Sequence, residues 1–182
     1  MEDSDILELF NAGERDRAFN LLVRKYSERL YWHIRNMVQI HEDADDVLQN
    51  TWIKVWDALD TFRQESQLYT WLYRIATNES VSFLKKARLK AALSLSDYER
   101  ALGNRLTADA YFSGDKIQLA LQKAIATLPP KQKAVFTLRY FQELPYEEIS
   151  EILETPVGSL KTSYHYAAGK VEEMVKKIVD SI

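Results

Sequence analysis

The chain has 182 residues and a formal net charge of −3, and its 46% apolar and 28% charged residues exclude a disordered protein. The absence of cysteine excludes disulfides, thiolate metal sites and cysteine nucleophiles, and the three histidines stand at unrelated spacings, so we expect no metal. No apolar run reaches the ~18 residues of a membrane span, and the acidic N-terminus does not match a signal peptide, so we expect a cytoplasmic protein without membrane insertion.

Long helices are predicted for the first ninety residues, because Gly and Pro are scarce and apolar residues recur at helical spacing. A short helix around residues 6–10 should end at Gly13. Apolar stripes over residues 19–37 and 44–59 predict a second and a third helix. A fourth helix, with Thr70 as its expected N-cap, ends in the cations of LKKARLK, which suit the negative end of the helix dipole.

Residues 91–114 lose this periodicity and gather Ser, Asp, Asn and Gly. This composition predicts a flexible linker, with room for one short helical piece. No other region divides the chain as well. We therefore expect an all-α fold of two small helical domains, residues 1–90 and 115–182, joined by this linker.

The second domain is also predicted to be helical. A helix over residues 117–128 precedes Pro130, which suits the first turn of the next helix. Further helices should start at Pro145 and, with Thr155 as N-cap, at Pro156. Two short helices joined by a tight turn are typical of a helix-turn-helix, although an ordinary helical bundle has the same pattern.

The charge is distributed unevenly. Residues 1–60 hold 7 basic and 13 acidic groups, whereas residues 61–90 hold 6 basic and 2 acidic groups. A basic stretch of this kind is typical of a solvated helix end as well as of a surface that binds nucleic acid. An acidic protein binds free DNA weakly, because phosphate neutralisation supplies most non-specific affinity. If DNA is a partner, another molecule must help to hold it.

Three segments carry a resemblance that none of them carries alone. They are DADDVLQNTWIKVW (43–56), FRQESQLYTWLYRIATNESVSFLKK (62–86) and LPPKQKAVFTLRYFQELPYEEISEILETPVGSLKTSYHYA (128–167). In this order they resemble bacterial sigma factors of the extracytoplasmic-function (ECF) group of the sigma-70 family. The resemblance implies that residues 1–90 are sigma region 2 and residues 115–182 are sigma region 4.

The resemblance also implies the activity. Such a protein binds core RNA polymerase, directs it to a promoter and helps to melt the −10 element, while region 4 reads the −35 element. It is not itself an enzyme and needs no cofactor. The implied partners are promoter DNA, the polymerase at its β′ clamp helices and β flap, and an anti-sigma factor as regulator.

The helix over residues 43–56 has an outer face that a merely solvated helix would not have. Two large apolar side chains lie there among acidic and amide residues. A polar rim around apolar anchors is typical of a protein interface. The resemblance implies that this face docks on the β′ clamp helices, through Asp46, Gln49, Asn50, Ile53 and Trp56.

The loop FRQESQLY and the following helix match the part of region 2 that captures unpaired −10 bases. Stacking on an aromatic side chain contributes ~1–3 kcal/mol per base, which offsets part of the melting cost of ~1.4 kcal/mol per duplex step. Arg74 equally suits a structural ion pair, and many relatives carry Gly where this chain has Gln64. The candidate −10 residues are Arg63, Ser66, Leu68, Tyr69, Arg74, Asn78, Lys85 and Lys86.

The last helix would carry the −35 contacts on its exposed face, at Ser159, Lys161, Thr162, Ser163, His165, Tyr166 and Lys170. Relatives usually have a run such as K-S-R-x-x-R-A-R, whereas this chain has Ser163, Tyr166 and Ala168 where arginines are frequent. Three lost phosphate contacts would lower the salt dependence of binding by up to ~3 units of slope. We expect weak −35 binding by this domain alone.

Two rival interpretations stay open. One is a stand-alone helix-turn-helix regulator in which residues 1–90 form a sensor domain. The other is a sigma-like regulator that docks on a signalling partner and has lost promoter activity. An enzyme is disfavoured, because the adjacent Asp45 and Asp46 point about 100° apart on a helix and do not form a general acid/base pair.

Overall fold

The computed structural model describes residues 1–91, 95–112 and 114–181, and every regular element in these ranges is helical. The predicted all-α fold is therefore confirmed. The elements are α1 (Asp3–Asn11), α2 (Arg15–Val38), α3 (His41–Ala58), the short 3-10 helix η1 (Leu59–Thr61), α4 (Leu68–Ala91), α5 (Leu95–Ala108), α6 (Lys116–Ala126), α7 (Pro130–Tyr140), α8 (Tyr146–Leu153) and α9 (Val157–Asp180).

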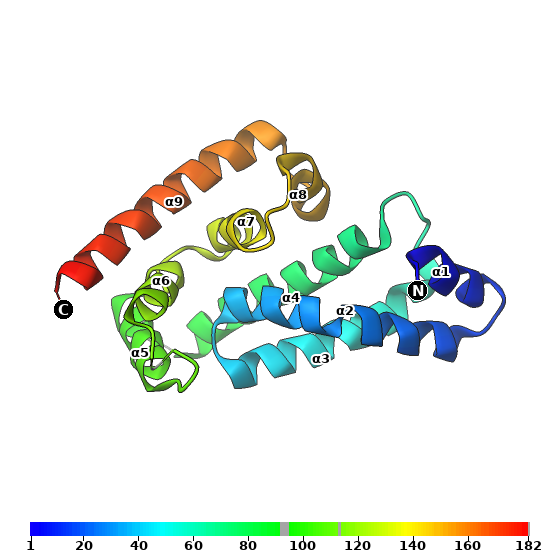
Figure 1. The fold of residues 1–182 in the computed structure, drawn as a ribbon, viewed down its shortest axis with the longest axis horizontal. Coiled ribbons are helices and arrows are strands. Elements are labelled where there is room, and N and C mark those ends of the chain that lie inside the picture. The colour runs from blue at the N-terminus through cyan, green and yellow to red at the C-terminus, as the bar shows by residue number, and fades with distance from the viewer. Residues whose placement is uncertain (92–94, 113, 182) are drawn as a thin grey trace.

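The N-terminal segment, residues 1–90, is a layer of three long helices with α1 packed against α2 (Figure 1). The stripe predicted over residues 19–37 places Leu22, Leu30 and Ile34 at 1% exposed or less, against α3 and α4. Gly13 follows α1 with a φ of 86°, a left-handed conformation that only glycine adopts without a steric penalty. The predicted end of the first helix is therefore confirmed.

Two predicted helix caps are wrong. Helix α4 begins at Leu68, so Thr70 is a buried residue of its first turn. Helix α9 begins at Val157, and the Thr155 hydroxyl donates a hydrogen bond to the Leu153 carbonyl at 3.0 Å instead of capping the helix. Threonine hydroxyls form hydrogen bonds in turns as well as in helix caps. A threonine in the sequence therefore indicates that a helix boundary is near but does not identify the N-cap residue.

The segment predicted as a linker contains α5, which is longer than one short helical piece. This helix has a narrow apolar side of two leucines four residues apart, too sparse to show as periodicity over the whole segment. This apolar side packs into a small buried cluster that also contains residues of the N-terminal and C-terminal segments. Its members are Ile40, Leu102, Leu106, Phe112 and Ala126.

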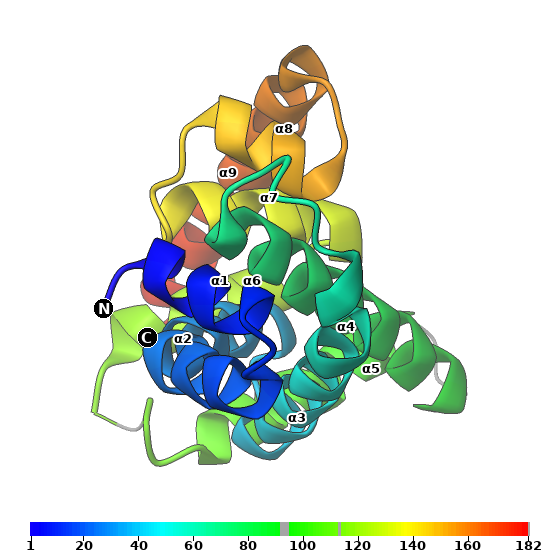
Figure 2. The ribbon, with the colours of Figure 1, turned by 90° about the vertical axis from the view of Figure 1, so that its right-hand side faces the viewer.

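The C-terminal segment, residues 115–182, packs directly on the N-terminal segment. Helix α7 begins at Pro130 as predicted and lies between α9 and the layer of α2 and α4 (Figures 1 and 2). Val135 and Leu138 of α7 belong to the same buried cluster as Leu72 of α4. We call this packing of α7 and α8 on α2 and α4 the closed arrangement.

Hydrogen bonds reinforce the closed arrangement at two places. The Tyr73 hydroxyl on α4 donates to the Gln142 side-chain oxygen at 2.9 Å. The Gln39 amide, at the end of α2, donates to the Gln122 carbonyl at 2.5 Å. Gln39 has a φ of 71°, which costs about 1 kcal/mol for a residue with a Cβ. The buried bond to Gln122 helps to offset this cost.

His33 is fully buried between α2 and α4. Its Nε2 shares a hydrogen bond of 2.7 Å with the Thr77 hydroxyl, and its Nδ1 has no hydrogen-bond partner among the described residues. Burial lowers the pKa of His33 to about 3, because an imidazolium here would be charged without solvent. The ring is therefore neutral in the folded protein at neutral pH.

Acid should destabilise the fold through this residue. Because the folded-state pKa of His33 lies below its unfolded value, stability is complete above pH 6.5 and is lost as the pH falls toward 3. The loss should be up to about 1.4 kcal/mol per pH unit. Urea unfolding at pH 7, 6 and 5 measures it. The exposed His165→Gln variant should keep the slope, and an NMR titration showing His33 protonated near pH 6 would contradict the prediction.

Candidate nucleic-acid and polymerase interfaces

The outer face of α3 is exposed, as the sequence predicts. Asp46, Gln49 and Asn50 are exposed, and Ile53 is 54% exposed although it is a large apolar side chain. An exposed isoleucine ringed by acidic and amide groups is suited to a partner with a small apolar pocket and basic surroundings.

Trp56 differs from the other four residues of this face, because it is half-buried in a contact of its own. The Arg15 guanidinium lies 4.3 Å from the centre of the Trp56 ring, and the Phe19 ring packs edge-on at 5.0 Å. Arg15 also donates to the Trp56 carbonyl at 2.5 Å and pairs with Asp60 at 2.6 Å. Trp56 thus anchors the end of α3 to α2 and leaves only part of its ring for a partner.

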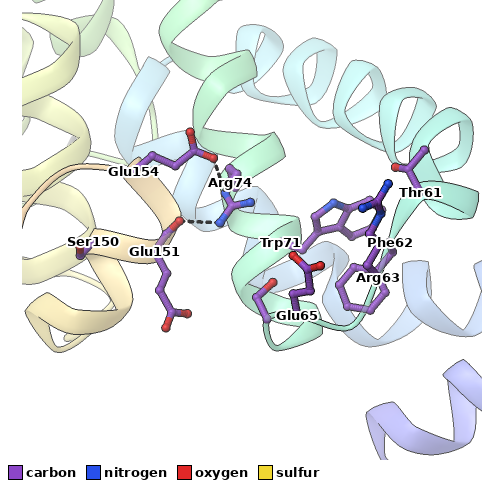
Figure 3. A pocket seen from close by; sticks show the side chains of 10 residues that line it. Thr61, Phe62, Arg63, Glu65, Trp71, Arg74, Ser150, Glu151 and Glu154 are labelled. Atoms are coloured by element: carbon purple, nitrogen blue, oxygen red, sulfur yellow. Dashed lines mark hydrogen bonds and ion pairs between the residues drawn. The ribbon is translucent and has the colours of Figure 1, made fainter.

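A cleft of about 500 Å³ opens between the loop before α4 and helix α8 (Figure 3). Arg63 and Ser66 of the loop and Trp71 of α4 line one side of it. Gln64 has a φ of 59°, the left-handed backbone that a glycine adopts freely. The chain therefore keeps a glycine-like backbone at the position where many relatives carry Gly.

Helix α8 closes the other side of this cleft. Arg74 donates to the Glu151 carbonyl at 2.6 Å and lies 3.6 Å from a Glu154 carboxylate oxygen (Figure 3). Burial, and then the Glu148 carboxylate beside it, raise the pKa of Tyr69 to about 12. Two members of the candidate −10 set, Tyr69 and Arg74, are thus turned toward the C-terminal segment.

Leu68 needs a correction. It is 3% exposed and packs in the main core cluster, so it has no surface to offer a base. The pattern placed it in the loop, but α4 already begins there and its first turn faces inward. Arg63, Lys85 and Lys86 of the same set are exposed.

Asn78 is exposed at the edge of a second cleft, of about 290 Å³. Ser159 and Ser163, from the first turns of α9, line the same cleft, together with Lys131 of α7. The candidate base-reading residue of α4 therefore faces the beginning of the candidate −35 helix. One closed arrangement covers parts of both predicted DNA surfaces.

The −35 candidates lie along α9, and all except the half-buried Ser163 are exposed, at Ser159, Lys161, Thr162, His165, Tyr166 and Lys170. Lys170 is thirteen residues beyond the helix start, ~20 Å along the axis, and donates to the Thr127 carbonyl at 3.1 Å. Of the three positions where relatives often have arginine, only Tyr166 is fully exposed, at 67%.

Sequence reasoning missed the acidic residues of α8. Glu148 and Glu151 of α8, and Glu154 directly after its end, meet the face of α4 that carries Tyr69 and Arg74. The run of acidic residues in YEEISEILE is visible in the sequence, but its partner is not. Among the described residues no cluster of His, Cys, Asp and Glu is suited to a metal ion, and no helix is long and apolar enough to span a membrane.

Comparisons with known proteins find matches to both segments of the chain. The family model of Sigma-70 region 2 matches residues 22–90, and that of Sigma-70, region 4 matches residues 118–170. The RNA polymerase sigma-H factor of Pseudomonas aeruginosa is 30% identical over 186 residues, covering 98% of this chain and 96% of that protein.

Solved structures with a similar fold include the following two. CnrH, in complex with the cytosolic domain of CnrY, matches with a TM-score of 0.68 and 22% identity over 97% of this chain and 99% of that one. The sigma factor RpoE, in complex with the anti-sigma factor NepR from Bartonella quintana, matches with a TM-score of 0.64 and 22% identity over 87% of this chain and 96% of that one.

The closed arrangement can be tested at Val81, a half-buried residue of α4 that lines the second cleft opposite α7 and α9. A carboxylate there would replace an apolar contact with the buried Ala134, Val135 and Leu160. The exposed Lys131 of the same cleft would offset only part of this cost. We expect Val81→Asp to separate the two segments and to raise the radius of gyration by several ångström above the ~16 Å of a compact chain of this length. Small-angle X-ray scattering measures it.

Val81→Thr is the matched control, because it keeps the shape of the side chain and adds no charge. It should leave the radius of gyration unchanged. An unchanged radius for Val81→Asp, with intact helix content by circular dichroism, would contradict the closed arrangement.

Proposed function

The chain belongs to the ECF group of the sigma-70 family and is a factor for promoter-directed transcription initiation, and from this membership we propose which of its surfaces meets which partner. We propose region 2 over residues 1–90, region 4 over residues 115–182 and a linker over residues 91–114. The polymerase performs the chemistry, and the chain acts with it in the cytoplasm.

The outer face of α3 is the surface for core RNA polymerase. The observation that carries this assignment is Ile53, 54% exposed among the exposed Asp46, Gln49 and Asn50. Trp56 contributes the edge that Arg15 and Phe19 leave free. The acidic rim suits the β′ clamp helices if these are basic, and it disfavours DNA at this face.

The second surface reads the −10 element. Ser66, Tyr69 and Asn78 contact the separated bases, while the exposed Arg63, Lys85 and Lys86 bind phosphates. Tyr69 and Arg74 are turned toward α8 in the closed arrangement, so reading the −10 element requires region 4 to leave α4. Arg74 becomes available to a phosphate in that step.

Region 4 reads the −35 element with the first three turns of α9. Lys161 and His165 are exposed there beside Tyr166. Few cations are available, which supports weak binding to this element by region 4 alone and a dependence on the polymerase, including its β flap. A stand-alone DNA-binding regulator is disfavoured for the same reason.

An anti-sigma factor is the proposed regulator. Solved structures with a similar fold include those of CnrH with the cytosolic domain of CnrY and of RpoE with the anti-sigma factor NepR. A protein that bridges the two regions of this chain would hold the closed arrangement and keep Tyr69 and Arg74 from DNA.

Run-off transcription tests the function directly. Purified core RNA polymerase with genomic fragments of the source organism should give discrete new transcripts only when this protein is added. Transcripts absent despite binding to core would favour the regulator that has lost promoter activity. No binding to core would contradict the proposed polymerase surface.

Ile53→Asp should weaken binding to core RNA polymerase by about tenfold or more, because it places a charge where an apolar anchor is expected. Ile53 is exposed, so the substitution should leave the fold intact. Co-elution and fluorescence titration with core measure the affinity. Glu28→Gln, a change at an exposed residue of α2 that is not part of the proposed face, is the control and should bind as the natural chain does.

A further inference from the structure

A small cavity of about 90 Å³ lies where region 2, the linker helix and region 4 meet. Its polar lining comes from three parts of the chain: Arg88 of α4, Tyr98 and Glu99 of α5, and Lys133 and Lys170 of region 4. The turn between α6 and α7 closes the rest with apolar and backbone atoms. None of the polymerase or −10 candidates lines this cavity.

Lys133 is the unusual member of the group. It is 2% exposed, and among the described residues its hydrogen bond is a long one, 3.5 Å to the side-chain oxygen of Gln39. Burial, and then the neighbouring Arg88, lower the pKa of Lys133 to about 8, so the ammonium stays mostly charged at neutral pH. A buried charge without an opposite charge beside it is costly.

The other charges of the cavity compensate this one only in part, because Glu99 favours the charged form of Lys133 less than Arg88 disfavours it. Arg88 and Lys170 add two cations, and Glu99 is the one carboxylate among the lining residues. Within the described residues no ion pair shorter than 4.0 Å joins Glu99 to any of the three cations. Lys170 donates to the Thr127 carbonyl, which places its ammonium at the cavity wall. The result is a small space, open to solvent at the exposed Arg88 and Lys170, with excess positive charge.

We propose that this cavity binds one phosphate group, as free orthophosphate or as the terminal phosphate of a nucleotide. A space of about 90 Å³ holds several water molecules and therefore one group of this size. A phosphate accepts charge-assisted hydrogen bonds from several cations at once. It would neutralise Lys133, whose charge Glu99 compensates only in part.

Binding at this place has a consequence for the conformation. The cations come from region 2 and from region 4, so the complete site exists only in the closed arrangement. A ligand that binds one of two states shifts the equilibrium toward that state. Phosphate binding therefore stabilises the closed arrangement and opposes promoter recognition.

The test is isothermal titration calorimetry and thermal unfolding of the full chain with orthophosphate, at constant ionic strength in chloride. At ten times the dissociation constant, orthophosphate should raise the melting temperature by about 3–6 °C. Adenosine diphosphate in a parallel titration distinguishes the two sources: tighter binding than orthophosphate assigns the site to a nucleotide, and equal or weaker binding assigns it to the free ion.

Lys133→Met removes the buried charge at similar side-chain length, and Arg88→Gln removes the exposed cation on region 2. Both should abolish or weaken binding at least tenfold. Lys131→Met is the matched control, because Lys131 is an exposed lysine of the same helix outside this cavity. A non-specific effect of phosphate on stability would be equal in all four proteins.

Equal responses of the natural chain and Lys133→Met would overturn the proposal, as would the absence of binding to either ligand. The titration contains neither polymerase nor promoter DNA. Its failure therefore leaves the transcription function untouched, and a failure of run-off transcription leaves the phosphate site untouched.

Discussion

The packing of α7 and α8 on α4 is the interaction on which the rest of this structure depends. Helix α4 contributes one side to the core with α2 and α3, and its other side forms the floor on which region 4 lies. The same helix carries Tyr69, Arg74 and Asn78, which we assign to the −10 element. On this assignment, the packing of region 4 and the recognition of the −10 element use the same surface of α4.

The surface that we propose for the polymerase is not covered by region 4. Helix α3 lies on the opposite side of the N-terminal layer from α9 (Figure 1), and Ile53 is exposed while α8 covers part of α4. Docking on the polymerase through α3 does not require region 4 to move, whereas reading the −10 element does. An order of events follows from the geometry, in which the polymerase can bind first and the separation of the regions completes the promoter site.

The junction between the regions is polar as well as apolar, which suits an interface that opens. Gln39, Gln122 and Lys133 are buried there, and water would satisfy all three after separation. An interface of leucines alone would resist opening, because its apolar surface has no favourable alternative in water. The ammonium of Lys133 is poorly compensated in the closed arrangement. An anion that neutralises this charge would therefore shift the equilibrium between closed and separated regions toward the closed arrangement.

The sequence by itself determined the helices and the family. Apolar spacing placed α2, α3, α4 and the helices of region 4 within a few residues, because each must bury one stripe and the pattern of 3.6 residues records which one. It also placed Ile53 outward, since the inward stripe of α3 left no other side for it. Only the tertiary structure decided that Leu68 is core, that α5 occupies the linker, and that Arg74 meets Glu151 and Glu154. These facts depend on contacts between residues distant in the chain. A local sequence pattern shows on which side of its helix a residue lies, but it does not show which distant element packs against that side.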